Sequence, residues 1–279
     1  MPHLWKLRSR TFDLDERPLV AGIVNVTPDS FSDGGLHLDP EAAIARGLEI
    51  LAEGADLVDV GAESTRPGAA AVPARTQIAR LKPVVEGLAR SGATVSVDTA
   101  SAEAAREAIA AGAEIVNDVS ALRDPDMAPL VVRSGAGLVL MHMRGSPETM
   151  QRDPRYDDVT ADIVSWFGVR LGAAKRAGIE MERIAIDPGL GFGKTVRHNF
   201  ELLARLEEFG ALGRPVMIGV SRKSFLGKTL ELPVDQRLEG GLAATAAAVM
   251  KGARILRTHD VRATVRAVWI AEEIRRAAR

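Results

Sequence analysis

Eight short runs of apolar and mostly β-branched residues recur along the chain. Within each run, neighbouring positions are hydrophobic almost without alternation, which is typical of parallel strands that are buried on both faces. The runs are residues 19–26, 57–62, 94–99, 114–121, 137–143, 183–189, 215–220 and 254–260.

The segments between these runs have helical patterns with recognisable ends. A glycine just past a helix supplies the left-handed conformation that stops it. This signal occurs at Gly54, Gly92, Gly112, Gly135, Gly178 and Gly252. Helix starts are expected at Asp39-Pro40-Glu41 and Asp124-Pro125-Asp126, where an acid precedes a proline, and at Ser101.

Eight strands alternating with helices over about 260 residues predict an α/β fold, a (β/α)8 TIM barrel. We expect one barrel domain over residues 18–279, because no Ser/Gly-rich linker or low-complexity tract divides it. Residues 1–17 are predicted to form an extra N-terminal element, with residues 4–14 covering the barrel floor.

Composition narrows the classes of partner. The 279 residues carry 36 Lys and Arg against 37 Asp and Glu, so no overall basic field exists to attract nucleic acid or an anionic membrane surface. No segment approaches the length of apolar sequence that a membrane span needs. The chain has no cysteine, and its start lacks the apolar core of a secretory signal. We therefore predict a cytoplasmic protein.

Polar residues end almost every predicted strand. In a barrel of this kind the active site lies at the carboxyl ends of the strands. Any one of these residues alone is as well explained as a helix cap or turn former, but eight converging sets favour a polar ligand. The residues are Asn25, Glu63, Ser64, Thr65, Arg66, Asp98, Asn117, His142, Asp187, Ser221, Arg222, Lys223, Arg257 and His259.

The residue types indicate a flat, nitrogen-rich heterocycle as ligand. Carboxylate and amide oxygens of Asp98, Asn117 and Asp187 can accept the paired N–H groups of an aminopyrimidinone edge, and Lys223 can donate to its carbonyl. Arg257 can stack on such a ring. Since Arg257 and His259 face Asn25 across the predicted mouth, they suggest a place for a diphosphate and Mg²⁺.

Two further segments carry candidate chemistry. Residues 27–35 and 64–73 are long and rich in glycine and proline, so we expect them to close over a reactive intermediate; tolerated surface loops are the simpler alternative. Lys223 and Ser224 are predicted to open a helix whose free N–H groups suit a carboxylate, although Ser224 could be an ordinary N-cap. There is no cysteine and no Ser-His-Asp order, so nothing indicates a covalent nucleophile.

Eight ordered motifs resemble those of the dihydropteroate synthases, the pterin-binding barrels of the folate pathway, over about residues 18–268. They are NVTPDSFSDGG (25–35), ESTRPGA (63–69), SVDT (96–99), NDVSAL (117–122), MHMRGSPETMQ (141–151), DPGLGFGKT (187–195), SRKSFLG (221–227) and THDV (258–261). Ala21, Ala62 and Thr258 depart from the family's usual residues, but none of them replaces a polar site residue.

The resemblance implies a transferase that condenses 6-hydroxymethyl-7,8-dihydropterin diphosphate with p-aminobenzoate, giving dihydropteroate and pyrophosphate by dissociative loss of the diphosphate. It implies Mg²⁺ as cofactor, held with the diphosphate by Asn25, Arg257 and His259, with Asn25 as the metal ligand. It implies a homodimer, for which the last helices are the expected interface. Catalytic roles fall to Asp98, Lys223, Arg257 and His259. The other implied substrate contacts are Thr65, Asn117, Met141 and Asp187 for the pterin diphosphate, and Phe31, Asp33, Arg66, Pro67, Phe192, Gly219 and Ser224 for p-aminobenzoate and the closing loops.

Three other functions use parts of the same pattern. A pterin-dependent methyltransferase would share Asp98, Asn117 and Asp187, but it needs a corrinoid partner and no diphosphate site. A non-catalytic pterin-binding homologue would not need Asn25, Arg66, Lys223 and His259. An aldolase-type barrel would use Lys223 as a Schiff-base former.

Overall fold

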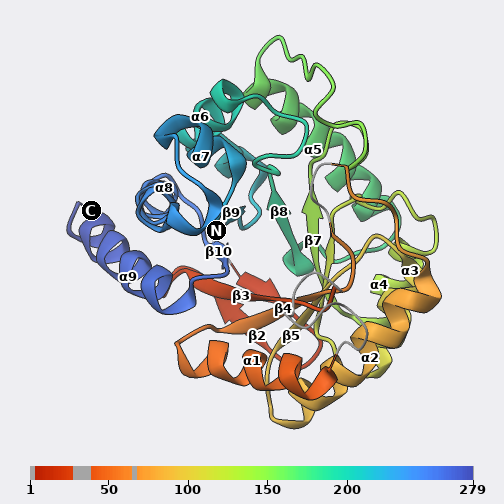
Figure 1. Cartoon of the computed structure of the whole chain (residues 1–279). Coiled ribbons are helices and arrows are strands. Elements are labelled where there is room, and N and C mark those ends of the chain that lie inside the picture. Colours follow the sequence, from red (N-terminus) through yellow and green to blue (C-terminus); the bar gives the residue numbers. More distant parts are fainter. Residues whose placement is uncertain (1–3, 28–38, 65–67, 279) are drawn as a thin grey trace.

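The structure is a computed structural model, and it describes residues 4–27, 39–64 and 68–278. Eight parallel strands surround one axis and helices surround the strands (Figure 1). The strands are β3 (Leu19–Asn25), β4 (Leu57–Gly61), β5 (Val95–Asp98), β6 (Ile115–Asp118), β7 (Gly137–Met141), β8 (Ile184–Asp187), β9 (Met217–Gly219) and β10 (Ile255–Thr258). The predicted (β/α)8 barrel is confirmed.

The barrel is nearly closed. Each strand pairs with the next in sequence, and β10 returns to pair with β3, so that Ile255 lies opposite Leu19. Between β8 and β9 the pairing is a single bridge from Ile186 to Val216. All eight predicted runs contain a strand, and each strand is shorter than its predicted run.

The run 114–121 illustrates why the strands end early. Strand β6 stops at Asp118, whose carboxylate accepts the backbone N–H groups of Ser120 and Leu122 at 2.8 and 2.7 Å. These bonds close a tight turn in which Ala121 and Leu122 both have positive φ. A short acidic side chain next to a strand thus folds the chain back onto itself.

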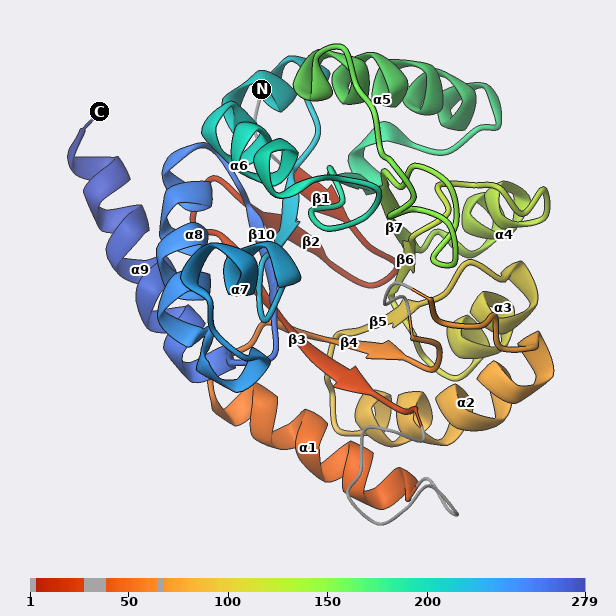
Figure 2. The same cartoon turned by 45° about the horizontal axis from the view of Figure 1, so that its top comes forward.

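Helices cover the outside of the barrel. They are α1 (Pro40–Ala52), α2 (Ala74–Arg90), α3 (Ala102–Ala110), α4 (Met127–Ser134), α5 (Val159–Arg176), α6 (Val196–Ala204), α7 (Ser224–Leu230), α8 (Leu238–Met250) and α9 (Val261–Ala277). Short 3₁₀ helices span Met181–Arg183, Leu206–Leu212 and Val234–Gln236. Helix α9 lies along α8 at the outer edge of the molecule (Figure 2). Among the described residues, no helix is both long and apolar enough to cross a membrane.

The helix signals are largely confirmed. All six glycines expected to stop helices have positive φ, between 69° at Gly135 and 114° at Gly112. Asp39 caps α1 by accepting the N–H of Glu41, and Ser101 caps α3 by accepting the N–H of Ala104.

The start predicted at Asp124-Pro125-Asp126 is wrong in detail. Helix α4 begins at Met127, and its N-cap residue Asp126 makes no capping bond with its side chain. Asp124 instead accepts the backbone N–H groups of Asp126 at 3.0 Å and of Ala102, at the start of α3, at 2.8 Å. Its carboxylate therefore stabilises the neighbouring helix, because the free N–H groups there are equally close.

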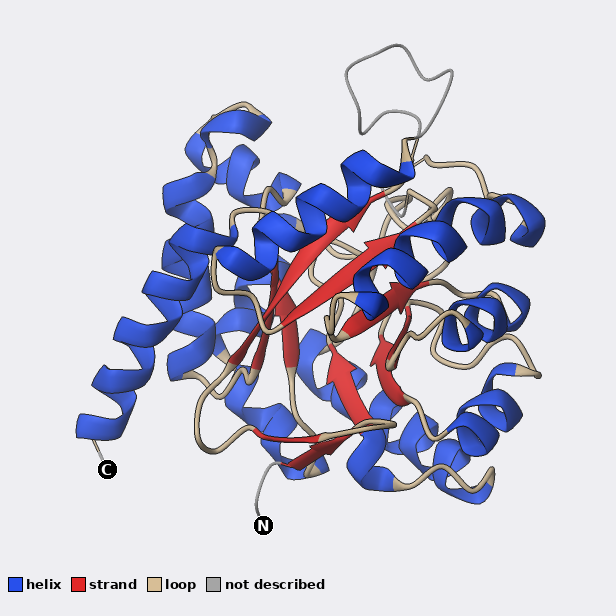
Figure 3. Cartoon of the chain, turned by 90° about the horizontal axis from the view of Figure 1, so that it is seen from below, coloured by secondary structure: helices blue, strands red, loops and turns tan. Residues whose placement is uncertain are grey.

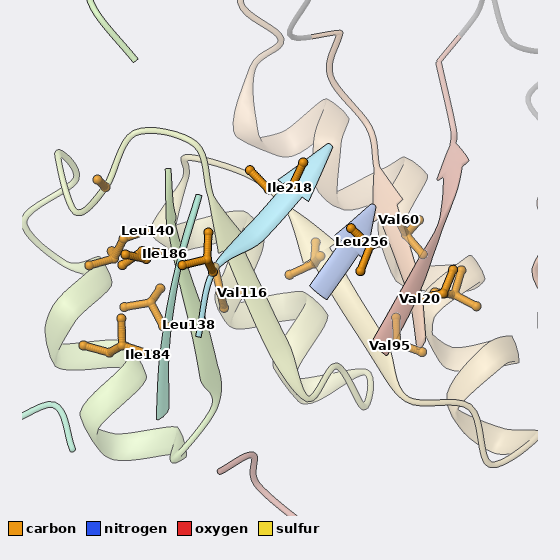
Figure 4. Packing of buried hydrophobic residues seen from close by; sticks show 14 of the residues in the cluster. Val20, Val60, Val95, Val116, Leu138, Leu140, Ile184, Ile186, Ile218 and Leu256 are labelled. Atoms are coloured by element: carbon orange, nitrogen blue, oxygen red, sulfur yellow. The ribbon is translucent and has the colours of Figure 1, made fainter. Parts of the chain in front are cut away.

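The core has an outer layer and an inner layer. Side chains on the outward face of the strands pack against the helices, and Figure 4 shows Val20, Val60, Leu138 and Ile186 in this layer. Inward-facing residues near the start of the strands form a separate cluster that fills the lower end of the barrel: Leu19, Ala21, Leu57, Ile115, Val139, Ala185, Met217 and Ile255. Polar side chains are thereby confined to the upper end.

An N-terminal hairpin covers the lower end. Strand β1 (Leu4–Lys6) pairs antiparallel with β2 (Thr11–Asp13), and the hairpin lies at the end of the barrel where the N-terminus is found (Figure 3). Trp5, Leu7 and Leu14 join the inner cluster, and the Trp5 indole donates to the carbonyl of Arg183 at 2.9 Å.

A buried ion pair attaches the last helix to the barrel. Arg254, just before β10, lies 3.1 Å from Glu272 on α9, and their side chains are 5% and 4% exposed. Arg275 also contacts Glu272, at 2.6 Å. The arginines hold the pKa of Glu272 down at about 2, against the opposing effect of burial.

Candidate active site

Inward-facing residues at the carboxyl ends of the strands meet at one mouth of the barrel. Four of them are register partners on consecutive strands: Asn25, Gly61, Asp98 and Asn117. On the opposite wall Met141 pairs with Asp187, and Gly219 pairs with Arg257. The register therefore brings seven of the predicted site residues to one rim.

Arg257 links two carboxylates inside this mouth. Its Nη2 donates to Asp98 Oδ2 at 2.9 Å, and its Nε donates to Asp59 Oδ2 at 2.6 Å. Burial raises the pKa of Asp98 to about 7, although the adjacent Arg257 charge acts to lower it. The stacking of Arg257 on a ring stays a prediction, since here its guanidinium lies against the two acids.

Asp187 is held by the turn that follows β8. Its Oδ1 accepts the N–H of Gly189 at 2.7 Å, and burial raises the pKa of its carboxyl group. Gly189 has φ of 71°, and a β-carbon there would lie 2.0 Å from the carbonyl oxygen of His142. Only glycine fits this turn, which directs Asp187 into the mouth.

Lys223 and Phe192 form the side of the mouth nearest α7. The Lys223 ammonium lies 4.0 Å from the centre of the Phe192 ring. Burial lowers the pKa of Lys223 to about 8, while Asp187 acts to raise it. Phe192 also packs on the apolar cluster that contains Met141, Met143 and Met150. This wall combines an aromatic face, thioethers and one cation.

A buried lysine supports the loop that carries Phe192. Lys194 donates to the carbonyl of Phe192 at 3.0 Å and lies 3.0 Å from His142 Nδ1. Burial lowers the pKa of Lys194 to about 7, against the opposing charge of Asp187. Burial also lowers the pKa of His142 to about 2, and the Lys194 charge adds to this effect. The His142 ring stands edge-on to Trp166, so this strand-end histidine is part of the packing behind the mouth.

His259 follows β10 and lies beside the segment after β9. Its Nδ1 is 3.1 Å from Ser221 Oγ, and that hydroxyl also lies 3.3 Å from Asp260 Oδ2. Arg222 pairs with Asp260 at 2.7 Å. Burial, together with Arg257, lowers the pKa of His259 to about 3, so its imidazole is neutral at pH 7.

Helix α7 begins at Ser224, as predicted, and Lys223 is its N-cap residue. The side chain of Lys223 makes no capping bond, and Ser224 at the first helical position is exposed. The free backbone N–H groups of this first turn are available to an anion.

Several predicted residues lie outside the described part of the chain. These are Phe31 and Asp33 of the first predicted loop, and Thr65, Arg66 and Pro67 of the second. Beyond them, the second stretch is described from Gly68, whose N–H donates to the carbonyl of Pro147 at 3.0 Å.

Asp59 is the site residue that the strand-end pattern did not predict. It lies in the middle of β4, its side chain is 1% exposed, and it contacts both Arg257 and Asn117. The available signal was a charge inside an apolar strand, two residues before Gly61 and hence on the same face.

Comparisons with known proteins agree with this geometry. The profile of the family described as pterin binding enzyme matches residues 21–259. The dihydropteroate synthase of Escherichia coli strain K12 is 44% identical over 269 residues, covering 96% of this chain and 95% of the relative. The dihydropteroate synthase of Mycobacterium leprae strain TN is 48% identical over 259 residues, covering 90% and 91%.

Solved structures show the same barrel. A Xanthomonas albilineans dihydropteroate synthase with 4-aminobenzoic acid superimposes with a TM-score of 0.91 and 46% identity, covering 98% of both chains. A Yersinia pestis dihydropteroate synthase in complex with a sulfonamide drug gives a TM-score of 0.92 and 42% identity, covering 98% of this chain and 99% of that one.

Proposed function

The chain belongs to the pterin-binding enzyme family, and we propose that it uses the barrel mouth to join a pterin diphosphate to p-aminobenzoate. The reaction is that of a dihydropteroate synthase, a transferase of folate biosynthesis. The observation that supports it best is the meeting of Asp98, Asn117 and Asp187 at one rim with the cations Lys223 and Arg257.

The pterin edge is proposed to bind to the acids and the amide. Asp98, Asn117 and Asp187 are buried, and beside the bonds that Asp98 and Asp187 accept from Arg257 and Gly189 their oxygens can accept the N–H groups of an aminopyrimidinone. Lys223, with its pKa near 8, is protonated at neutral pH and can donate to the ring carbonyl. Met141 and Phe192 provide apolar surface for the ring itself.

The diphosphate is proposed to lie between Arg257, His259 and Asn25. A β-carbon on Gly61 would lie 3.7 Å from Asn25 Oδ1 and 3.5 Å from the Asp98 β-carbon, so this amide oxygen borders the mouth. Neutral His259 can donate one N–H to a phosphate oxygen, and Arg257 supplies charge.

The residues present fit a Mg²⁺ ion that arrives with the diphosphate. In the described ranges there is no group of three or more His, Cys, Asp or Glu side chains that could surround an ion. Asn25 offers a single oxygen, which suits an ion that keeps several waters and takes phosphate oxygens. When bound, Mg²⁺ would neutralise charge on the leaving pyrophosphate.

The proposed transfer is dissociative. The bond between the pterin methylene carbon and the diphosphate oxygen breaks, and its electron pair leaves with pyrophosphate. The lone pair of the arylamine then forms the new C–N bond, and that nitrogen loses a proton. An ionised Asp98 stabilises the positive charge that develops on the pterin, and no enzyme nucleophile takes part.

The p-aminobenzoate site is proposed beside Phe192, Gly219, Lys223 and Ser224. Its carboxylate would bind at the start of α7, where free N–H groups and the helix dipole favour an anion. The family resemblance adds Phe31, Asp33, Thr65, Arg66 and Pro67, which are predictions from the sequence alone.

We also propose a homodimer through the last helix. Trp269, Ile270 and Ile274 on α9 are 60%, 65% and 55% exposed, an unusual amount of apolar surface for one helix. A cytoplasmic location, which the lack of cysteine favours, likewise stays a prediction.

The decisive experiment combines purified protein, Mg²⁺ and both substrates, and measures pyrophosphate release. We expect release only when the arylamine is present, with dihydropteroate formed in equal amount. Methyl transfer from a methylated folate to a corrinoid, without pyrophosphate release, would instead support the methyltransferase. Borohydride trapping of a carbonyl substrate on Lys223 would support the aldolase. Pterin binding without either reaction would indicate a non-catalytic homologue.

A further inference from the structure

A buried carboxylate oxygen that accepts from two side chains lies beneath the proposed pterin pocket. Asp59 Oδ2 accepts from Arg257 Nε at 2.6 Å and from Asn117 Nδ2 at 3.1 Å. The side chains of Asp59 and Asn117 are almost completely buried, which makes both hydrogen bonds costly to lose. The other oxygen, Oδ1, has no hydrogen-bond partner among the described residues.

These contacts determine which way the Asn117 amide faces. A carboxylate accepts hydrogen bonds and does not donate them, so the group of Asn117 that faces Asp59 must be its NH₂. The amide oxygen is consequently turned away from Asp59. Asn117 is the register partner of Asp98 at the rim, so its free oxygen is available to a ligand there.

We propose that Asp59 is a positioning residue that sets the hydrogen-bond polarity of the pterin pocket. By holding the NH₂ of Asn117, it makes the pocket side of that amide an acceptor. The pocket then selects a ring with an N–H donor at this place, such as a 2-amino-4-oxo pyrimidine, over a ring that presents a carbonyl. This inference rests on the proposed function, because it concerns the specificity of the same site.

Asp59 also orients Arg257, so a loss of affinity alone would not identify its role. Removing the carboxylate leaves Arg257 with Asp98 as its remaining acid. That change should weaken binding of any ring in the pocket to a similar extent. The ratio of affinities for amino and oxo rings isolates the effect of the Asn117 amide.

The test measures calorimetric affinities for 6-hydroxymethylpterin and for 6-hydroxymethyllumazine, in which a carbonyl replaces the 2-amino group. We expect the unaltered protein to prefer the pterin at least tenfold, because facing acceptors repel and leave buried groups unpaired. Asp59→Ala and Asp59→Leu remove the acceptor, so the side-chain amide of Asn117 is free to rotate. The ratio of pterin to lumazine affinity should therefore fall at least tenfold.

Asp59→Asn is the conservative variant. Arg257 has only donors, so it should hold the amide oxygen of the new side chain in the place of Oδ2 and keep Asn117 in its present orientation. We expect this variant to retain the preference within about threefold, even where its affinity for both rings falls. Asp118→Asn is the matched control, since Asp118 is equally buried but bonds to the turn after β6.

Three outcomes overturn the inference. They are a preference below twofold in the unaltered protein, an unchanged preference in a folded Asp59→Ala or Asp59→Leu variant, and an equal narrowing in Asp118→Asn. Failure of the unaltered protein to bind either ring would overturn the proposed function instead. If neither Asp59→Ala nor Asp59→Leu folds, the inference is tested by two ratios of pterin to lumazine affinity, that of the unaltered protein and that of Asp59→Asn.

Discussion

The guanidinium of Arg257 donates to Asp98 across the barrel mouth at 2.9 Å, and burial raises the pKa of this carboxyl group to about 7. The proposed chemistry needs that carboxylate ionised while the pterin is positive. We predict that Asp98→Asn lowers turnover by about a hundredfold or more, because electrostatic stabilisation at the reacting centre is lost. Pyrophosphate release measures this, and the thermal midpoint shows whether the variant is folded. A folded variant with near-normal turnover would refute the role.

Lys223 should make pterin affinity depend on pH. Burial lowers its pKa to about 8, so its ammonium is present below that pH and is lost as the pH rises through it. We predict that affinity for the pterin declines above about pH 8, measured by calorimetry. In Lys223→Met the part of the decline in affinity that comes from this lysine should disappear. Any change of affinity with pH that remains in that variant comes from titration of the ligand. Identical slopes in both proteins would contradict the prediction.

Gly189 is predicted to tolerate no side chain. In Gly189→Ala the new β-carbon would meet the carbonyl oxygen of His142 at 2.0 Å, at a positive φ, so the turn must move. We expect a loss of about 2 kcal/mol or more in the free energy of unfolding, and weaker pterin binding because Asp187 loses its N–H donor. Denaturant unfolding measures the first effect. The control is Gly213→Ala, also at positive φ but with open space around it.

Glu272 should make stability fall in acid. Its pKa is about 2 in the folded chain, below the ordinary value of 4.5, so its contribution is complete above about pH 4.5 and is lost as the pH falls towards 2. We predict that Glu272→Gln costs about 3 kcal/mol at pH 7, since the substitution removes the carboxylate charge beside the buried Arg254. The difference between the two proteins should shrink below pH 4.5. A constant difference from pH 7 to pH 3 would exclude this origin.

The exposed face of α9 gives a test of the proposed dimer. Trp269→Glu places a charge beside the exposed side chains of Ile270 and Ile274, so we predict a shift from dimer to monomer in sedimentation velocity. Val169→Glu is the control, because Val169 is 68% exposed on the distant helix α5. If the unaltered protein is a monomer, the proposed dimer is excluded. If the dimer persists in Trp269→Glu, its interface lies elsewhere.

The fold could be predicted because its signals are local. Unbroken apolar runs indicate strands buried on both faces, and glycines such as Gly112 and Gly252 need positive φ whatever surrounds them. Strand ends were less predictable, since Asp118 closes a turn through its own side chain and shortens β6. Asp124 shows a further limit of prediction from sequence. Which of two helix starts its carboxylate caps depends on how α3 and α4 pack together.

The site was predictable where polar residues end strands, as at Asp98, Asn117 and Asp187. Asp59 could not be found from strand ends, because it lies one layer deeper in the barrel, between apolar neighbours in β4. Lys194 could not be found either, because its burial depends on how the chain packs around His142. A residue that supports another residue has no sequence pattern of its own. Its role becomes visible only when Arg257 and Asn117 are found on the same oxygen.

The N-terminal hairpin has a consequence for the timing of folding. The surface under Trp5 and Leu7 is made of residues from across the barrel, from Leu19 to Ile255. During synthesis this hairpin is made before β3, yet its docking site is complete only after β10 has been made. The hairpin therefore docks only after the strands that follow it in the chain, and until then the Trp5 side chain is exposed to solvent.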